Sequence, residues 1–140
     1  MRQAKHISSA DNPVIKRIKA MKDRGSRSSK VRDETGLAFI EGIHLIQAWL
    51  GSDDLIEIFT TSKALEVVEI AATVETHLAL TPTTNLYILD DSLWKKMSEL
   101  ADGPQIMGCI KISNNEFPIG FSDDLIILDA IQDAGNVGSI

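Results

Sequence analysis

Apolar residues recur along this chain in two alternating patterns, one typical of helices and one typical of short buried strands. Strands are predicted in "LAFIEG", "LIEIFTT", the segment around Leu86 to Leu89 and "PQIMGCIKI". Helices are predicted in "IHLIQAWLG", in "SKALEVVEIAATVE" from Ser62, and from a cap at Asp91 or Ser92 through Leu100. Strands that alternate with helices in this way predict an α/β sandwich in which parallel pairings are favoured.

The first helix is predicted from its capping residues. Asn12 suits the N-cap and Pro13 the first helical position, where its missing N–H costs nothing. The apolar residues that follow form one stripe, with cations on the other faces: Val14, Ile15, Ile18 and Met21. Gly25 would end the helix, and the polar, unperiodic "SRSSKVRDETG" is predicted to be a mobile loop.

Composition narrows the class of protein. The chain has 140 residues, 44% hydrophobic and 24% charged, which is typical of an ordinary globular protein. No apolar stretch reaches the roughly 18 residues of a membrane span, and the N-terminus has no apolar core of a signal peptide, so we expect a cytoplasmic protein that does not bind a membrane. The single cysteine, Cys109, lies in an apolar run and is expected to be an inert core thiol.

Charge is sorted along the chain. The net charge is −6, yet residues 1–32 hold ten Lys or Arg against two Asp, and the rest of the chain is strongly acidic. A basic segment on an acidic body indicates a polyanionic partner, and nucleic acid comes first; a solvated basic helix face is the alternative. The cations that we expect to contact phosphates are Lys16, Arg17, Lys19, Arg24, Arg27, Lys30 and Arg32.

Few other side chains suggest chemistry. The three histidines have no Cys, Asp or Glu at metal-ligand spacing, so no metal is expected. His44 is read more simply as a partly exposed residue at a helix start than as a substrate contact. Glu41 lies at the end of a buried strand, where α/β proteins place their sites, and we include it among the predicted nucleic-acid contacts; the alternative is that it caps the next helix.

The end of the chain has a different character. "SNNEFPIGFSDD", residues 113–124, is predicted to be a linker, and "LIILDA" after it is predicted to be a strand buried on both faces. The turn "QDAGNVGSI" that follows suits an anion or ribose site, although a plain turn with Asn136 as helix N-cap fits equally well.

Four segments together resemble one family. "LIILDAIQDAGNVGSI" resembles the first signature motif of the SpoU-type, or TrmH-type, RNA 2′-O-ribose methyltransferases. "ISSADNPVIKRIKAM", "AFIEGIHLIQAWL" and "KKMSELADGPQIMGCIKI" are similar to upstream segments of these enzymes, in the same order. The resemblance therefore covers nearly the whole chain.

The resemblance implies a fold and a function. It implies that residues 1–112 form an RNA substrate-binding domain, a three-layer α/β sandwich like the kink-turn-binding ribosomal proteins, and that residues 125–140 begin a knotted SPOUT methyltransferase domain. The family methylates ribose 2′-hydroxyls, usually in rRNA, with S-adenosylmethionine, and dimerises through the knot. Asn136 matches an asparagine of the active centre, whereas the motif's arginine would stand two positions beyond Ile140.

This implies that the chain is a fragment that binds RNA, binds no cofactor by itself and is inactive alone. Two other functions fit the sequence. One is a non-catalytic RNA-binding adaptor, and the other is a nucleotide-binding α/β protein that uses "GNVGS" as its phosphate loop.

Overall fold

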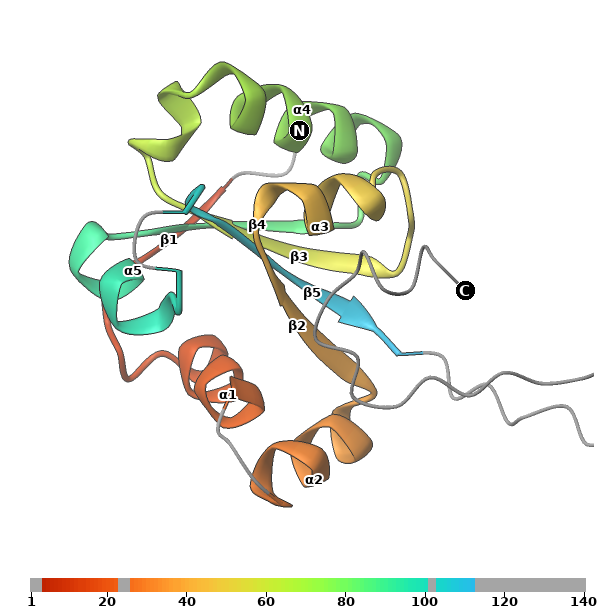
Figure 1. The fold of residues 1–140 in the computed structure, drawn as a ribbon, viewed down its shortest axis with the longest axis vertical. Coiled ribbons are helices and arrows are strands. Elements are labelled where there is room, and N and C mark those ends of the chain that lie inside the picture. The colour runs from red at the N-terminus through yellow and green to blue at the C-terminus, as the bar shows by residue number, and fades with distance from the viewer. Residues whose placement is uncertain (1–3, 23–25, 101–102, 113–140) are drawn as a thin grey trace, which may run out of the picture.

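The computed structural model describes residues 4–22, 26–100 and 103–112, and of residues 26–29 the backbone only. These residues form a five-stranded sheet with helices on both faces (Figure 1). The elements in chain order are β1 (Lys5–Ile7), α1 (Pro13–Lys22), α2 (Ser26–Thr35), β2 (Leu37–Glu41), α3 (Ile43–Ala48), β3 (Leu55–Thr60), the 3-10 helix η1 (Ala64–Glu66), α4 (Val68–Leu80), β4 (Asn85–Leu89), α5 (Asp91–Met97) and β5 (Ile106–Lys111).

The sheet has the strand order β1-β4-β3-β5-β2. The predicted parallel pairing is confirmed for β4 with β3; β1 also pairs parallel with β4, whereas β5 runs antiparallel between β3 and β2. The seven residues of α5 extend for only about 10 Å, so this helix does not carry the chain back across the sheet before β5 begins. β1 was not predicted, because three residues are too few to show a period.

Two hydrophobic clusters cover the two faces of the sheet. On one face, α1 and α5 pack on the strands through the buried residues Ile15, Ile18, Met21, Leu93, Trp94 and Met97. On the other, α3 and α4 do so through Ile43, Ile46, Ile70 and Val74. Figure 1 shows the sheet between these two groups of helices. The predicted three-layer α/β sandwich is confirmed for the described residues.

Helix boundaries agree with the sequence where a cap is clear. Asn12 Oδ1 accepts the Val14 N–H at 2.9 Å, which confirms it as the cap of α1. The predicted cap of α5 is wrong by a residue, because Asp90 precedes the helix and its carbonyl accepts the Trp94 N–H at 2.9 Å; α5 also ends at Met97 rather than Leu100.

The helix predicted to begin at Ser62 corresponds to α4, and its predicted start is wrong. A 3-10 turn, whose Ala64 N–H donates to Thr61 Oγ1 at 3.1 Å, comes first, and α4 begins only at Val68. Val67 between them is extended, with φ −81° and ψ 118°. A β-branched residue accepts this conformation readily, so the helical period of the sequence is broken here without a visible signal.

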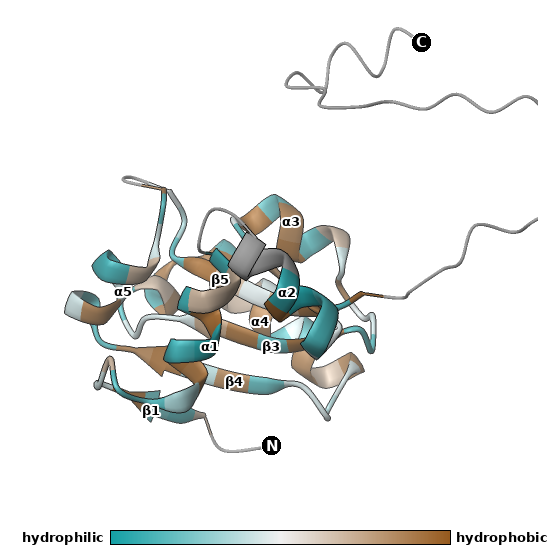
Figure 2. Cartoon of the chain, turned by 90° about the horizontal axis from the view of Figure 1, so that it is seen from below, coloured by the Kyte–Doolittle hydropathy of each residue, from teal (hydrophilic) through white to brown (hydrophobic). Residues whose placement is uncertain are grey.

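The predicted mobile loop at "SRSSKVRDETG" is also wrong, because Ser26–Thr35 form α2. Among the described side chains of this helix, residues 30–35, only Val31 packs against the core, and Figure 2 shows α2 as largely hydrophilic. Glu34 pairs with Lys30 one turn away at 3.7 Å, which supports the helix weakly. Gly36 ends it in the left-handed region at φ +62°.

His77 joins three segments at the end of α4. Its side chain is fully buried, and its Nδ1 accepts the Gly51 N–H at 3.1 Å. Its Nε2 lies 3.1 Å from the Leu55 carbonyl oxygen, 2.9 Å from Thr81 Oγ1 and 3.0 Å from Thr84 Oγ1. Burial lowers the pKa of His77, although the Leu55 carbonyl and the charge of Asp53 act in the opposite direction.

The middle of β5 is tightly packed. Cys109 is fully buried, which confirms the predicted core thiol, and burial together with the nearby Glu57 raises its pKa to about 12. At Gly108, a Cβ would lie 2.8 Å from the Cδ1 atoms of both Ile46 and Leu55. Glycine at this position therefore lets α3 approach the sheet.

Candidate nucleic-acid interface

Helix α1 separates its apolar and cationic residues. Ile15, Ile18 and Met21 are buried against the sheet, whereas Lys16 and Lys19 are exposed. This division confirms the amphipathic helix that the sequence predicts. It leaves a cationic surface on the outer side of the first layer.

The predicted RNA contacts differ in how they are engaged. Lys16 pairs with Asp11 at 3.1 Å, and both side chains are largely exposed, so this pair is weak and leaves the lysine accessible. Lys30 and Arg32 are exposed on α2. Arg27 lies in α2 with its side chain outside the described part, and Arg24 lies outside the described residues altogether.

Arg17 has a carboxylate partner inside the protein. Its guanidinium pairs with Glu57 on β3, and the two side chains are 31% and 7% exposed. Burial alone would lower the pKa of Arg17, but the hydrogen bond and charge of Glu57 raise it overall. Arg17 Nε is buried without a hydrogen-bond partner. This arginine therefore fastens α1 to the sheet, and a contact with RNA stays a prediction.

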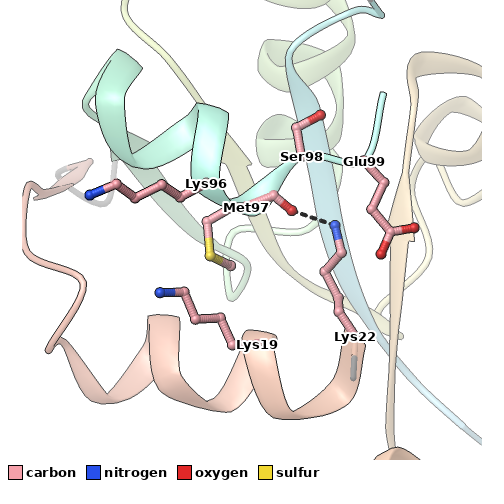
Figure 3. Close-up of a pocket in the computed structure, with 6 residues that line it drawn as sticks. All are labelled: Lys19, Lys22, Lys96, Met97, Ser98 and Glu99. Atoms are coloured by element: carbon pink, nitrogen blue, oxygen red, sulfur yellow. Dashed lines mark hydrogen bonds between the residues drawn. The ribbon is translucent and has the colours of Figure 1, made fainter. Parts of the chain in front are cut away.

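A pocket of 370 Å³ lies between the C-terminal parts of α1 and α5 (Figure 3). The residues that line it are Lys19, Lys22, Lys96, Met97, Ser98 and Glu99. Three of the six are lysines, and they come from two helices that are far apart in the sequence. The pocket therefore gathers positive charge that no single segment of the chain carries.

Lys22 is the fixed member of this group. Its ammonium donates to the Met97 carbonyl and to Glu41 Oε2, the latter at 3.2 Å, and lies 4.9 Å from the centre of the Phe39 ring. Its side chain is only 13% exposed. These contacts leave the charge in place while restricting the motion of the side chain.

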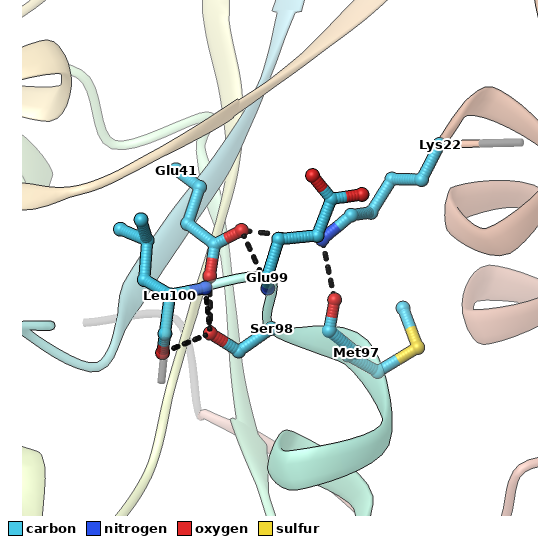
Figure 4. A network of polar contacts seen from close by, with 6 residues as sticks. All are labelled: Lys22, Glu41, Met97, Ser98, Glu99 and Leu100. Atoms are coloured by element: carbon cyan, nitrogen blue, oxygen red, sulfur yellow. Dashed lines mark hydrogen bonds and ion pairs between the residues drawn. The ribbon is translucent and has the colours of Figure 1, made fainter. Parts of the chain in front are cut away.

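Glu41 is the hub of a polar network that joins α1, β2 and the segment after α5 (Figure 4). It accepts hydrogen bonds from the Ser98 hydroxyl and, at 3.2 Å, from the Glu99 N–H. Burial would raise the pKa of Glu41, but the bonds from Ser98, Glu99 and Lys22 together lower it.

The alternative that Glu41 caps the next helix is wrong. Gly42, at φ +110°, precedes α3, and the helix has no side-chain cap. The Glu41 carboxylate instead makes its hydrogen bonds to α1 and to residues 98 and 99. Its predicted contact with RNA stays a prediction.

Lys22 and Lys96 are pocket residues that were absent from the predicted RNA contacts. Their charge is visible in the sequence, but only the packing of α1 beside α5 places Lys96 near Lys19 and Lys22. A basic pair at the end of a predicted helix, as in "WKKM", was the only available signal. Such pairs usually complement the helix dipole.

A second pocket, of 640 Å³, lies between the start of α4 and residues 103–105. Gln105, one of its lining residues, is held by two threonines at the end of β3: Thr61 Oγ1 donates to Gln105 Oε1 at 2.6 Å and Thr60 Oγ1 donates to the Gln105 carbonyl at 2.7 Å. These bonds hold the segment before β5 in place. The lining also includes the charged side chains of Lys63, Glu66 and Glu69.

The remaining predictions concern His44, metal sites, membrane spans and the C-terminal segment. His44 is exposed at the start of α3, as expected. Within residues 4–22, 26–100 and 103–112, no three His, Cys, Asp or Glu side chains gather as a metal site would require. No helix in this part of the chain is both long and apolar enough to span a membrane. Asn136, the linker and the strand after it lie outside the described residues.

Comparisons with known proteins agree with this fold. The model of the family described as MRM3-like substrate binding domain matches residues 12–108. The chain is similar to the solved structure of an RNA 2′-O ribose methyltransferase, with a TM-score of 0.61 and 20% identity over 79% of this chain and 39% of that one.

It is also similar to an rRNA methyltransferase from Sinorhizobium meliloti, with a TM-score of 0.55 and 19% identity over 78% of this chain and 37% of that one. An AdoMet-bound rRNA methyltransferase from Sinorhizobium meliloti gives a TM-score of 0.53 and 18% identity over the same shares. At such identities the likeness shows the fold alone, and the chain spans less than two fifths of these structures. No curated protein matches it.

Proposed function

The chain belongs to the family of MRM3-like substrate binding domains, and on this premise we propose that it holds a structured RNA for a 2′-O-ribose methyltransferase. The match covers residues 12–108, so it confirms the resemblance to the N-terminal substrate-binding domain of the SpoU/TrmH-type enzymes. Residues 125–140, the expected start of a catalytic domain, lie beyond it.

The observation that carries the proposal is the cationic outer face of α1 beside the basic pocket. Lys16 and Lys19 are exposed on the side of α1 that faces away from the core, and Lys96 joins them from α5. Lysine ammonium groups on a rigid helix suit phosphate contacts, which position an RNA without reading its sequence. The acidic remainder of the chain would repel the same RNA and so restrict it to this face.

The finer parts of the proposal concern the whole enzyme. We infer that residues 1–112 form the RNA-holding domain, that 113–124 link it to a methyltransferase domain beginning at 125, and that Asn136 belongs to the active centre. The RNA would be rRNA, the enzyme a cytoplasmic homodimer and the methyl donor S-adenosylmethionine. An AdoMet-bound structure among the similar proteins supports the choice of donor.

The basic pocket between α1 and α5 does not fit the donor. S-adenosylmethionine carries a positive sulfonium group, and the pocket between α1 and α5 is lined by three lysines, which would repel it. We therefore derive no catalytic step for this part of the chain. Its proposed task is to bind and orient RNA, and it should be inactive alone.

The test is the salt dependence of RNA binding by the full chain, measured by fluorescence anisotropy with a labelled rRNA hairpin. Two or more phosphate contacts predict an affinity loss of roughly tenfold or more between 50 and 200 mM salt. A Lys16→Gln and Lys19→Gln double variant should bind more weakly and show a shallower salt dependence.

The matched control removes the same charge elsewhere, through Lys63→Gln and Lys111→Gln, two exposed lysines outside α1 and α5. Net charge falls equally in both double variants, so their difference isolates the face of α1. An RNA affinity that does not change with salt, or equal losses in the two variants, would refute the proposed binding face.

A further inference from the structure

The basic pocket holds two lysines without an internal partner. Lys19 reaches it from α1 and Lys96 from α5, and within the described residues neither forms an ion pair or a side-chain hydrogen bond. In Figure 3 the Met97 side chain lies between Lys96, above it, and Lys19, below it. Two helices thus bring unneutralised ammonium groups to one pocket.

The carboxylates nearby do not cancel this charge. Glu41 is engaged with Lys22, Ser98 and the backbone of Glu99. Glu99 itself lines the pocket, but in Figure 3 its carboxylate lies beyond Lys22, on the side away from Lys19 and Lys96. The part of the pocket between the two free lysines therefore has positive potential.

Lys22 strengthens this potential without being free to move. Because its ammonium is held by Glu41, the Met97 carbonyl and the Phe39 ring, it adds a charge whose position is set before any ligand arrives. The Met97 carbonyl, which would otherwise repel an anion at the C-terminal end of α5, is already occupied by this ammonium. The arrangement is preorganised for an anion.

We propose that this pocket binds one phosphate group of the RNA backbone, with Lys19 and Lys96 as its two ligands and Lys22 as the fixed charge behind them. The proposal rests on the proposed function, and it deepens it by naming one bridging phosphate between α1 and α5. A volume of 370 Å³ lies within the range of small ligand sites and leaves room for the neighbouring ribose. Mutual repulsion of the lysines would be relieved when the phosphate enters.

The experiment compares RNA affinities of the full chain carrying Lys96→Gln or Lys95→Gln. The two lysines are neighbours on α5, both exposed, but only Lys96 lines the pocket. We expect Lys96→Gln to weaken binding about fivefold, as for one phosphate contact, and Lys95→Gln by less than about twofold. Equal effects of the two variants would overturn the proposal while leaving the proposed function intact.

A double variant tests whether one phosphate is shared. If Lys19 and Lys96 hold the same phosphate, removing both lowers the slope of log affinity against log salt by about 1; separate phosphates would lower it by about 2. Glu99→Gln removes the only carboxylate that lines the pocket, and should tighten RNA binding about twofold. A slope change near 2, or weaker binding by Glu99→Gln, would contradict a single shared phosphate.

Titration with inorganic phosphate distinguishes a site for the RNA backbone from a site for a free anion. Titration of the wild-type chain, followed by amide shifts of residues 96–99, should show weak binding that the double variant loses, and excess phosphate should compete with RNA. If the wild-type chain binds inorganic phosphate in this pocket but binds no RNA, the pocket is a site for a free anion. Both the proposed function and the assignment of the phosphate to RNA are then wrong. If the chain binds RNA but inorganic phosphate changes no amide shift in residues 96–99, only the proposal for this pocket fails.

Discussion

Replacing His77 with phenylalanine should destabilise the folded chain by about 3 kcal/mol and reduce its sensitivity to mild acid. The ring lies fully buried where α4 ends, and its two nitrogens hold segments before β3 and after α4. Phenylalanine has a similar shape, so the change removes polar contacts without opening a large cavity. The loss of stability in His77→Phe therefore measures the contribution of the hydrogen bonds made by the His77 ring.

The expected loss of stability follows from the hydrogen bonds that His77→Phe removes. The Gly51 N–H loses its acceptor, Nδ1, at a cost of about 1–3 kcal/mol, and the bond that Nε2 donates is worth about 1 kcal/mol more. Thr81 and Thr84 keep other acceptors, because their hydroxyls donate to the His77 and Leu55 carbonyls at 2.7 and 2.9 Å. The sum is about 2–4 kcal/mol, a large fraction of the stability of a small domain.

The pH dependence has a definite sign. The pKa of His77 is lowered in the folded chain, chiefly by burial, so the unfolded chain takes up a proton first as pH falls. The contribution of the neutral ring is fully present above the unfolded pKa of about 6.5 and is lost as pH falls from there toward the folded pKa. Protonation would also turn Nδ1 into a second donor facing the Gly51 N–H.

The assay is urea unfolding followed by tryptophan fluorescence at pH 7.5, 6.5 and 5.5. Wild type should lose stability across this range, and His77→Phe should lose less. His44→Phe is the matched control, because His44 is exposed and its replacement should change stability by less than about 0.5 kcal/mol. The reasoning fails if His77→Phe costs no more than the control, or if its pH dependence equals that of the wild type.

Two further changes test the packing of the two layers on the sheet. Gly108→Ala should lower stability by about 1–3 kcal/mol, because the new methyl group would lie 2.8 Å from Ile46 and Leu55; a melting temperature equal to the wild type would show that α3 shifts freely. Arg17→Leu should cost about 3 kcal/mol by leaving the buried Glu57 without its partner, and adding Glu57→Leu should restore most of the loss in urea unfolding. No recovery in the double variant would show that the pair is not the cause.

Much of the fold could be predicted because local signals agreed with the tertiary structure. Asn12 and Pro13 mark the start of α1 by chemistry that acts within one turn, and the strand segments are apolar because the sheet is covered on both faces. α2 lacks such a signal, since nine of its ten residues are polar and, among its described side chains, only Val31 packs against the core. A helix that is stabilised by packing beside α1 and by Gly36 at its end cannot be recognised from the pattern of hydropathy.

The candidate site was predicted only in part for a similar reason. The charge of α1 is local and visible, but whether a cation is free depends on partners far along the chain. Arg17 meets Glu57 and Lys22 meets Glu41 only in the folded sheet. Lys96 becomes relevant only once α5 packs beside α1. Sequence spacing contains no information about either juxtaposition.

The position of β5 in the sheet has a consequence for folding during protein synthesis. β2 is made early, yet among the described strands it pairs only with β5, which lies between it and β3. Until residue 111 has left the ribosome, β1, β4 and β3 are able to assemble, but β2 has no neighbour and one edge of β3 stays open. Because an open edge recruits other strands, a nascent chain from which β5 has not yet emerged would be more prone to aggregate than one from which β5 has emerged.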